Sequence, residues 1–121
     1  MQGIWNPEFW RTMDDLVAGT RIVIDRPKGT AHPRFPKIVY PMDYGYLEGT
    51  AAMDGQGIDV WVGSRPEKDA DALIVTVDLM KRDSEIKLLL GLTEEEKQRI
   101  MAFHNDSASM KGLLIRREEL P

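Results

Sequence analysis

The segment YPMDYGYLEGTAAMDGQGIDVWVG, residues 40–63, gathers three tyrosines, a glycine-rich acidic turn and a short apolar strand in about one fifth of the chain. Near its end, apolar residues at positions 58, 60 and 62 alternate with Asp59, Trp61 and Gly63. This period of two is typical of a half-buried strand. We therefore expect Asp59 to leave the sheet on the face opposite the aliphatic side chains.

The turn before this strand carries two carboxylates, Asp54 and Asp59, separated by Gly55 and Gly57. Glycine adopts positive φ at little steric cost, so such a loop can direct both carboxylates to one point. Hard cations such as Mg²⁺ take oxygen ligands, usually one or two carboxylates together with waters and phosphate oxygens. From spacing alone the alternative stays open that this is a solvated hairpin turn, because Asp-Gly is a common hairpin signal.

Length and composition narrow the possible functions. A chain of 121 residues without internal repeats predicts one domain over residues 1–121. Sixteen basic and 20 acidic residues give a net charge of −4, and the acids are spread, so we expect neither a nucleic-acid nor a membrane surface. The absence of cysteine removes disulfides, zinc–thiolate sites and thiol nucleophiles. No signal peptide or apolar run of about 20 residues is visible, which predicts a cytoplasmic protein.

Local signals predict two helices. Asn6 as N-cap, Pro7 at the first helical position and Gly19 as a stop predict a helix over residues 7–18. Thr93 and Glu96 form a capping box that predicts a second helix to about His104, which we expect at the surface near the helix end. Strands are expected at residues 21–25, 38–40, 44–47, 58–62, 72–80, 85–90 and 112–116. This order predicts a mainly β (α+β) fold: a small closed β-barrel with flanking helices.

The segment at residues 40–62 resembles the signature of the soluble, metal-dependent family I inorganic pyrophosphatases. In that family Tyr-Pro-x-x-Tyr-Gly-Tyr is followed by Asp-Gly-Asp-Pro-x-Asp and an apolar strand. A Val-Ile-acid-x-Pro segment at residues 23–27 and an acid-x-Lys segment at 85–87 keep the same order. The resemblance implies an OB-like barrel that hydrolyses pyrophosphate, or a related phosphoanhydride, with Mg²⁺ (Mn²⁺ could substitute), usually as a homo-oligomer.

The resemblance also implies roles for individual residues. The catalytic residues would be Asp54, Gln56 and Asp59. The metal ligands would be Asp25, Asp54, Asp59, Asp83 and Glu85, with Asp78 as the alternative to Asp83. The substrate would be bound by Lys28, Arg34, Tyr40, Tyr44 and Lys87, and by Lys111 in place of a Tyr-Lys pair that this sequence lacks. Glu85 and Lys87 alternate along one strand, so both can point into one pocket.

Gln56 departs from the family pattern, because it stands where the family has its general-base aspartate. Glutamine cannot accept a proton at neutral pH, and general-base catalysis typically contributes about 10²- to 10⁴-fold. Two alternatives to an active hydrolase therefore stay open. One is a weak or inactive pyrophosphatase-like protein that binds phosphate-rich ligands. The other is an OB-type nucleic-acid-binding module, which the acidic composition disfavours.

Overall fold

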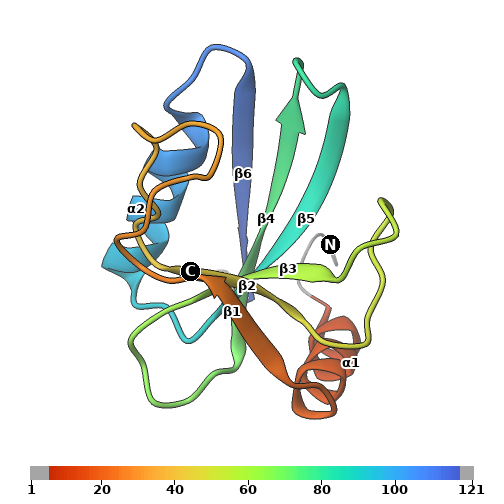
Figure 1. Ribbon diagram of the computed structural model, residues 1–121. Helices are drawn as coiled ribbons and strands as arrows, with labels where there is room; N and C mark the ends of the chain where they lie inside the picture. Colours follow the sequence, from red (N-terminus) through yellow and green to blue (C-terminus); the bar gives the residue numbers. More distant parts are fainter. Residues whose placement is uncertain (1–5, 118–121) are drawn as a thin grey trace.

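The computed structural model describes residues 6–117, which form one six-stranded sheet and two helices (Figure 1). The helices are α1 (Pro7–Ala18) and α2 (Glu94–Asn105). The strands are β1 (Ile22–Arg26), β2 (Asp43–Leu47), β3 (Ile58–Val62), β4 (Ala70–Asp78), β5 (Asp83–Leu90) and β6 (Met110–Arg116). Their order in the sheet is β1-β2-β3-β5-β4-β6, and only β3 and β5 pair in parallel. Neither helix is long and apolar enough to cross a membrane.

The sheet is open, which corrects the expectation of a closed OB-like barrel. The outer strands are β1 and β6, and no pairing joins them within residues 6–117. Pro27 ends β1, because proline cannot donate to a ladder. On the outer edge of β6, the Asn105 side chain donates to the Gly112 carbonyl (3.2 Å) and accepts from its amide (3.1 Å). The expected mainly β architecture with an N-terminal and a C-terminal helix is confirmed.

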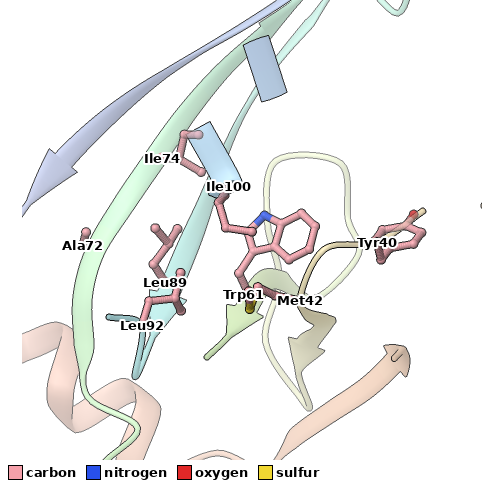
Figure 2. Packing of buried hydrophobic residues seen from close by; sticks show 8 residues of the cluster. All are labelled: Tyr40, Met42, Trp61, Ala72, Ile74, Leu89, Leu92 and Ile100. Atoms are coloured by element: carbon pink, nitrogen blue, oxygen red, sulfur yellow. The ribbon is translucent and has the colours of Figure 1, made fainter. Parts of the chain in front are cut away.

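The two helices cover opposite faces of the sheet (Figure 1). On the α1 face, Trp10 packs against aliphatic residues such as Val60 and Leu88. On the α2 face, Ile100 packs with Trp61 and Leu89 (Figure 2). Because side chains alternate along a strand, neighbouring residues of β3 and of β5 contribute to different cores. A β-bulge between residues 70 and 72 adjusts the register of β4 against β5.

Most predicted elements are confirmed, and one strand is not. Helix α1 has the expected bounds, and the predicted capping box begins α2. Residues 38–40 form no strand; the segment between β1 and β2 holds only an isolated bridge between Ala31 and Val39. Pro36 and Pro41 flank those residues and interrupt any ladder.

Gly45 fixes the approach of β1 to β2. A Cβ atom at this position would lie 1.8 Å from the carbonyl oxygen of Val23. Only glycine therefore allows this pairing, which sets Gly45 opposite Ile24 and Tyr46 opposite Val23. The glycine of the Tyr-Gly-Tyr segment is thus a packing requirement of the sheet.

Candidate functional site

Lys87 of β5 is the centre of a polar cluster on the α2 face of the sheet. Its Nζ donates to the Tyr44 hydroxyl (2.7 Å), to Asp59 Oδ2 (3.0 Å) and to Glu85 Oε2 (2.8 Å). An ammonium group has three donors, and all three are used here. The cluster therefore joins one cation, two carboxylates and one phenol from the adjacent strands β2, β3 and β5.

Strand register brings these residues together. The β2–β3 pairing sets Tyr44 opposite Trp61, two residues beyond Asp59 on the same strand face. The parallel β3–β5 pairing sets Val60 beside Leu88, so the residues that precede them, Asp59 and Lys87, project together on the other face. The cluster is built on sheet positions and does not depend on a loop closing over it.

The Lys87 ammonium and the Glu85 carboxylate stabilise each other's charged form. Burial favours the neutral form of Lys87, but its contacts with Tyr44, Asp59 and Glu85 outweigh burial and raise its pKa. For Glu85, burial opposes ionisation, yet the hydrogen bond and charge of Lys87 lower its pKa overall. Burial is the main reason that the pKa of Tyr44 is raised, so this phenol keeps its proton at neutral pH.

The two carboxylates form the solvent-facing side of the cluster. The side chains of Asp59 and Glu85 are 29% and 27% exposed, whereas that of Lys87 is only 8% exposed. Asp83 precedes Glu85 on the same face of β5; burial and the neighbouring Glu85 carboxylate raise the pKa of Asp83. A ligand that approaches from solvent therefore meets negative charge before it meets Lys87.

The remaining acids predicted as metal ligands lie elsewhere. Asp54 occupies an exposed turn, where its carboxylate accepts from the Gln56 amide (2.8 Å). Gln56 is exposed in the same turn, and its backbone carbonyl accepts from the Ala52 amide (2.7 Å). Asp25 is an exposed residue at the irregular end of β1. In the described part of the chain, no group of three or more acidic or histidine side chains is arranged to hold a metal ion.

The other predicted substrate-binding residues lie in two parts of the fold, the segment between β1 and β2 and strand β6. Tyr40 is buried, with its ring 5.6 Å from that of Tyr44. Lys28 and Arg34 are exposed in the segment that joins β1 to β2. Lys111 of β6 donates from Nζ to the Asn105 carbonyl (3.1 Å) at the end of α2.

Sequence reasoning missed the role of His104, which is buried rather than at the surface as expected. Its Nε2 accepts from Trp61 Nε1 (3.1 Å), so the ring proton belongs on Nδ1, which faces Met110 Sδ at 3.5 Å. Burial, and secondarily the charge of Lys87, lower the pKa of His104 to about 4. Helical spacing could have predicted that His104 is buried, since it lies four residues after the buried Ile100 and therefore on the same face of α2.

Cations from three separate segments act electrostatically on His32, and two of them were not predicted. Arg26, at the end of β1, lies opposite Tyr44 in the β1–β2 pairing. Lys81 lies in the turn between β4 and β5. Burial first, and then the charges of Arg26, Lys81 and Arg34, lower the pKa of His32. Lys81 also acts on Glu85, so its charge reaches one carboxylate of the cluster. The sequence offered no local signal for Lys81.

Comparison with known proteins gives structural neighbours only. No protein-family model matches this sequence, and no curated protein matches it. An inorganic pyrophosphatase from Neisseria gonorrhoeae is similar in structure, with a TM-score of 0.60 and 16% identity over 74% of this chain and 77% of that chain. An inorganic pyrophosphatase from Coxiella burnetii gives a TM-score of 0.57 and 16% identity over 79% and 84%. One from Helicobacter pylori gives 0.56 and 14% over 78% and 81%. At such low identity the likeness shows a similar fold.

Proposed function

We propose that the protein hydrolyses inorganic pyrophosphate, or a related phosphoanhydride, to phosphate with Mg²⁺, for which Mn²⁺ could substitute. The cluster around Lys87 is the observation that supports this best. It combines ammonium, carboxylate and phenol groups on one sheet face of a fold similar to that of solved inorganic pyrophosphatases. Phosphoryl transfer requires a protein mainly to position the reactants and neutralise charge, and these groups suit both tasks.

The carboxylates of the cluster suit one hard cation. Asp59 and Glu85 are both partly exposed to solvent, and a carboxylate oxygen of each lies within 3.0 Å of the Lys87 nitrogen. The two carboxylates therefore already hold one positive charge between them. Mg²⁺ usually binds through one or two carboxylates and completes its shell with water and phosphate oxygens. Asp59 and Glu85 would hold the ion, with Asp83 beside them. When bound, it would lower the pKa of water and neutralise phosphate charge.

Substrate would bind as its metal complex. Two carboxylates and one ammonium leave a net charge of −1 at the cluster, which repels a free pyrophosphate anion. With the carboxylates engaged by a cation, Lys87 is free to donate to a phosphate oxygen, and the protonated Tyr44 hydroxyl can donate as well. Lys28, Arg34, Tyr40 and Lys111 stay in the proposal as the further substrate-binding residues.

The loop that carries Asp54 and Gln56 is the feature that indicates slow turnover. Both residues stay in the proposal as catalytic candidates with Asp59, because the loop directly precedes β3. Gln56 can orient a water through its amide but cannot take its proton. Asp54 is occupied by a hydrogen bond to the backbone of its own turn. We therefore propose a rate below that of an enzyme with an acid at position 56.

The same loop favours a second candidate function, which is binding without turnover. A protein that holds a metal–pyrophosphate complex at Asp59, Glu85 and Lys87, and lacks a base at position 56, would bind phosphate-rich ligands and release them unchanged. This candidate predicts tight, metal-dependent binding with no phosphate release above background.

Phosphate release separates the two functions. Purified protein is incubated with pyrophosphate and Mg²⁺, Mn²⁺ or no metal, and binding is followed in parallel by calorimetry. Hydrolysis predicts metal-dependent release that Asp59→Asn abolishes and Gln56→Asp increases, while Asp15→Asn on the exposed side of α1 has no effect. Metal-dependent binding without release supports the second function. Neither binding nor release would overturn both.

The proposal keeps three further expectations from the sequence. We propose a homo-oligomer, located in the cytoplasm, that uses neither nucleic acid nor membrane as a partner. An exposed apolar surface on β4, β5 and β6 is the feature that favours self-association, formed by Val77, Ile86 and Leu113.

A further inference from the structure

The segment between β1 and β2, residues 27–42, exposes apolar surface that a bare pyrophosphate would not use. Phe35 is 56% exposed, and Ile38 and Val39 are exposed as well. Arg34 precedes Phe35 and is also exposed. A cation next to an exposed aromatic ring suits a ligand that has both a phosphate and an apolar planar group.

The backbone of this segment holds Phe35 in a defined position. The Ile38 amide donates to the Phe35 carbonyl (2.9 Å), and the His32 amide donates to the Ile38 carbonyl (2.8 Å). His32 Nδ1 accepts from the amides of Arg34 (3.0 Å) and Phe35 (3.3 Å). Phe35 thus lies in a hydrogen-bonded turn that positions its ring.

A row of aromatic rings connects Phe35 to the Lys87 cluster. The ring centroid of Phe35 is 5.2 Å from that of His32, and His32 lies parallel to Tyr40 at 6.2 Å. Tyr40 in turn is 5.6 Å from Tyr44, whose hydroxyl accepts from Lys87. The exposed aromatic surface and the proposed phosphate site therefore belong to one continuous arrangement of side chains.

Arg26 lies opposite Tyr44 in the β1–β2 pairing, and Arg34 directly precedes Phe35, so a cation occurs near each end of the row of rings. Arg26, Arg34 and Lys81 all act electrostatically on His32, and Lys81 also acts on Glu85 of the cluster. Three cations are more than a single diphosphate needs beside Lys87, and they suit a longer polyphosphate chain. The exposed Phe35 ring therefore suits a base, the cations suit phosphates, and the carboxylates of the Lys87 cluster suit a metal ion.

We infer that the protein binds and hydrolyses nucleoside polyphosphates, with the base stacked on Phe35 and His32 and the phosphates held by Arg26, Arg34, Lys81 and the Lys87 cluster. This inference rests on the proposed function for its chemical step and adds a substrate class to it. In that step the oxygen of water bonds to the terminal phosphorus, and the bond from that phosphorus to the bridging oxygen breaks. The products are inorganic phosphate and the nucleotide shortened by one phosphate, and one proton passes to solvent.

Binding is tested first, with a readout that does not depend on turnover. In a Phe35→Trp variant, a stacked base should quench the added tryptophan fluorescence when ATP and Mg²⁺ are supplied. Pyrophosphate with Mg²⁺ should leave the signal unchanged, and adenosine, which lacks phosphates, should bind at least ten-fold more weakly than ATP. The wild-type protein supplies the background from its own tryptophans. Absence of quenching by ATP, or equal quenching by pyrophosphate, would overturn the inference.

Kinetics test the role of Phe35 separately from the proposed function. Phe35→Ala should raise KM for ATP roughly ten-fold, because stacking on one aromatic ring contributes on that scale. It should leave KM for pyrophosphate within two-fold, and Leu113→Ala on the opposite sheet face should change neither. Equal effects on both substrates, or release of phosphate from pyrophosphate but none from ATP, would refute the inference and spare the proposed function. Quenching by ATP without hydrolysis of either substrate would refute the proposed function and the hydrolytic half of the inference.

Discussion

Lys87 is the residue on which the candidate site depends, because it supplies the positive charge between Asp59 and Glu85. Lys87→Met keeps most of the side-chain volume and removes the charge, which leaves two partly buried carboxylates facing each other. Unpaired buried charges are costly, and the partial exposure of these two reduces the cost to about 2 kcal/mol. We expect the free energy of unfolding to fall by that amount in urea titrations at neutral pH.

Mg²⁺ should compensate for the loss of Lys87. A divalent ion bound only by the folded state stabilises it by an amount that grows with the logarithm of the ion concentration relative to Kd. Adding Mg²⁺ should therefore raise the stability of Lys87→Met by more than that of the wild type, while Lys111→Met, an exposed control, should match the wild type. If Mg²⁺ acts equally on all three proteins, Asp59 and Glu85 do not form the cation site.

His104 should make the fold sensitive to mild acid. Its pKa is about 4 in the folded protein and about 6.5 when unfolded, so the unfolded state takes up the proton first. Its contribution to stability is complete above pH 6.5 and is lost as pH falls towards 4. The 2.5-unit difference corresponds to a loss of up to about 3 kcal/mol. Unfolding in urea at pH 7, 5.5 and 4.5 measures it.

A His104→Gln variant isolates this contribution. The pKa of His32 is also lowered, so His32 titrates in the same direction and the wild-type curve contains both histidines. Glutamine can still accept from Trp61 and has no proton to gain, so the variant should lose less stability between pH 7 and 4.5. An identical pH slope in the two proteins would show that His104 is not the titrating group.

Single residues of the site could be predicted only where the signal was local. The spacing of Glu85 and Lys87 predicted that both side chains point to the same side of their strand, and in the structure they are hydrogen-bonded to each other. Tyr44 and Asp59 contact Lys87 across 43 and 28 residues of sequence, and only the sheet register brings them there. The family pattern named Tyr44, Asp59 and Lys87 but not the contacts between them. The two glycines of the turn suggested that the Asp54 and Asp59 carboxylates would face one point, whereas the Asp54 carboxylate accepts a hydrogen bond from the backbone of its own turn.

At the level of elements, the end of α2 protects the outer edge of β6. The side-chain amide of Asn105 makes the two hydrogen bonds to the Gly112 backbone that a neighbouring strand would make. Its nitrogen also donates to the Met101 carbonyl (2.8 Å). Ser107 similarly accepts from the Met110 amide (3.0 Å). An unprotected edge strand is a template for association, so these side chains limit edge-to-edge pairing.

Asn105→Ala should destabilise the fold and expose this edge. The loss of three hydrogen bonds predicts a fall of about 1 to 2 kcal/mol, reduced slightly because alanine is the better helix former. Light scattering during refolding should increase at the same time. Gln98→Ala, at an exposed position of the same helix, controls for helix propensity. Unchanged scattering would mean that the edge is protected by other means.

The bounds of an element were predicted correctly where capping residues mark its ends. Asn6, Pro7 and Gly19 define α1, and Thr93 with Glu96 defines the start of α2, because caps are satisfied by adjacent residues. Closure of the sheet could not be predicted in this way. Closure depends on whether β1 pairs with β6. The Asn105 side chain occupies the backbone groups of Gly112 on the outer edge of β6, and neither residue carries a sequence signal for a sheet edge.

At the scale of the whole molecule, the sheet is only partly covered on its α1 face. Ile86, Val75 and Leu113 are cross-strand neighbours on β5, β4 and β6, and Val77 continues the same face. Ile86 and Leu113 are 55% and 64% exposed, whereas Leu73, nearer to α1, is buried. A contiguous exposed apolar surface on a sheet is typical of an interface. A second copy presents the same surface, so two-fold packing would bury both copies.

We therefore predict that Ile86→Lys combined with Leu113→Lys lowers the oligomeric state without unfolding the chain. Lysine at both positions places like charges opposite each other across a two-fold interface, and both side chains can extend into solvent in the monomer. Sedimentation velocity should give a smaller species than the wild type at equal concentration, with an unchanged far-UV circular dichroism spectrum. Met53→Lys, at a fully exposed apolar position in the loop before β3, should sediment like the wild type. A wild-type protein that sediments as a monomer at every concentration would remove both the interface and the expected homo-oligomer, and would leave the Lys87 site unaffected because that site lies on the other face of the sheet.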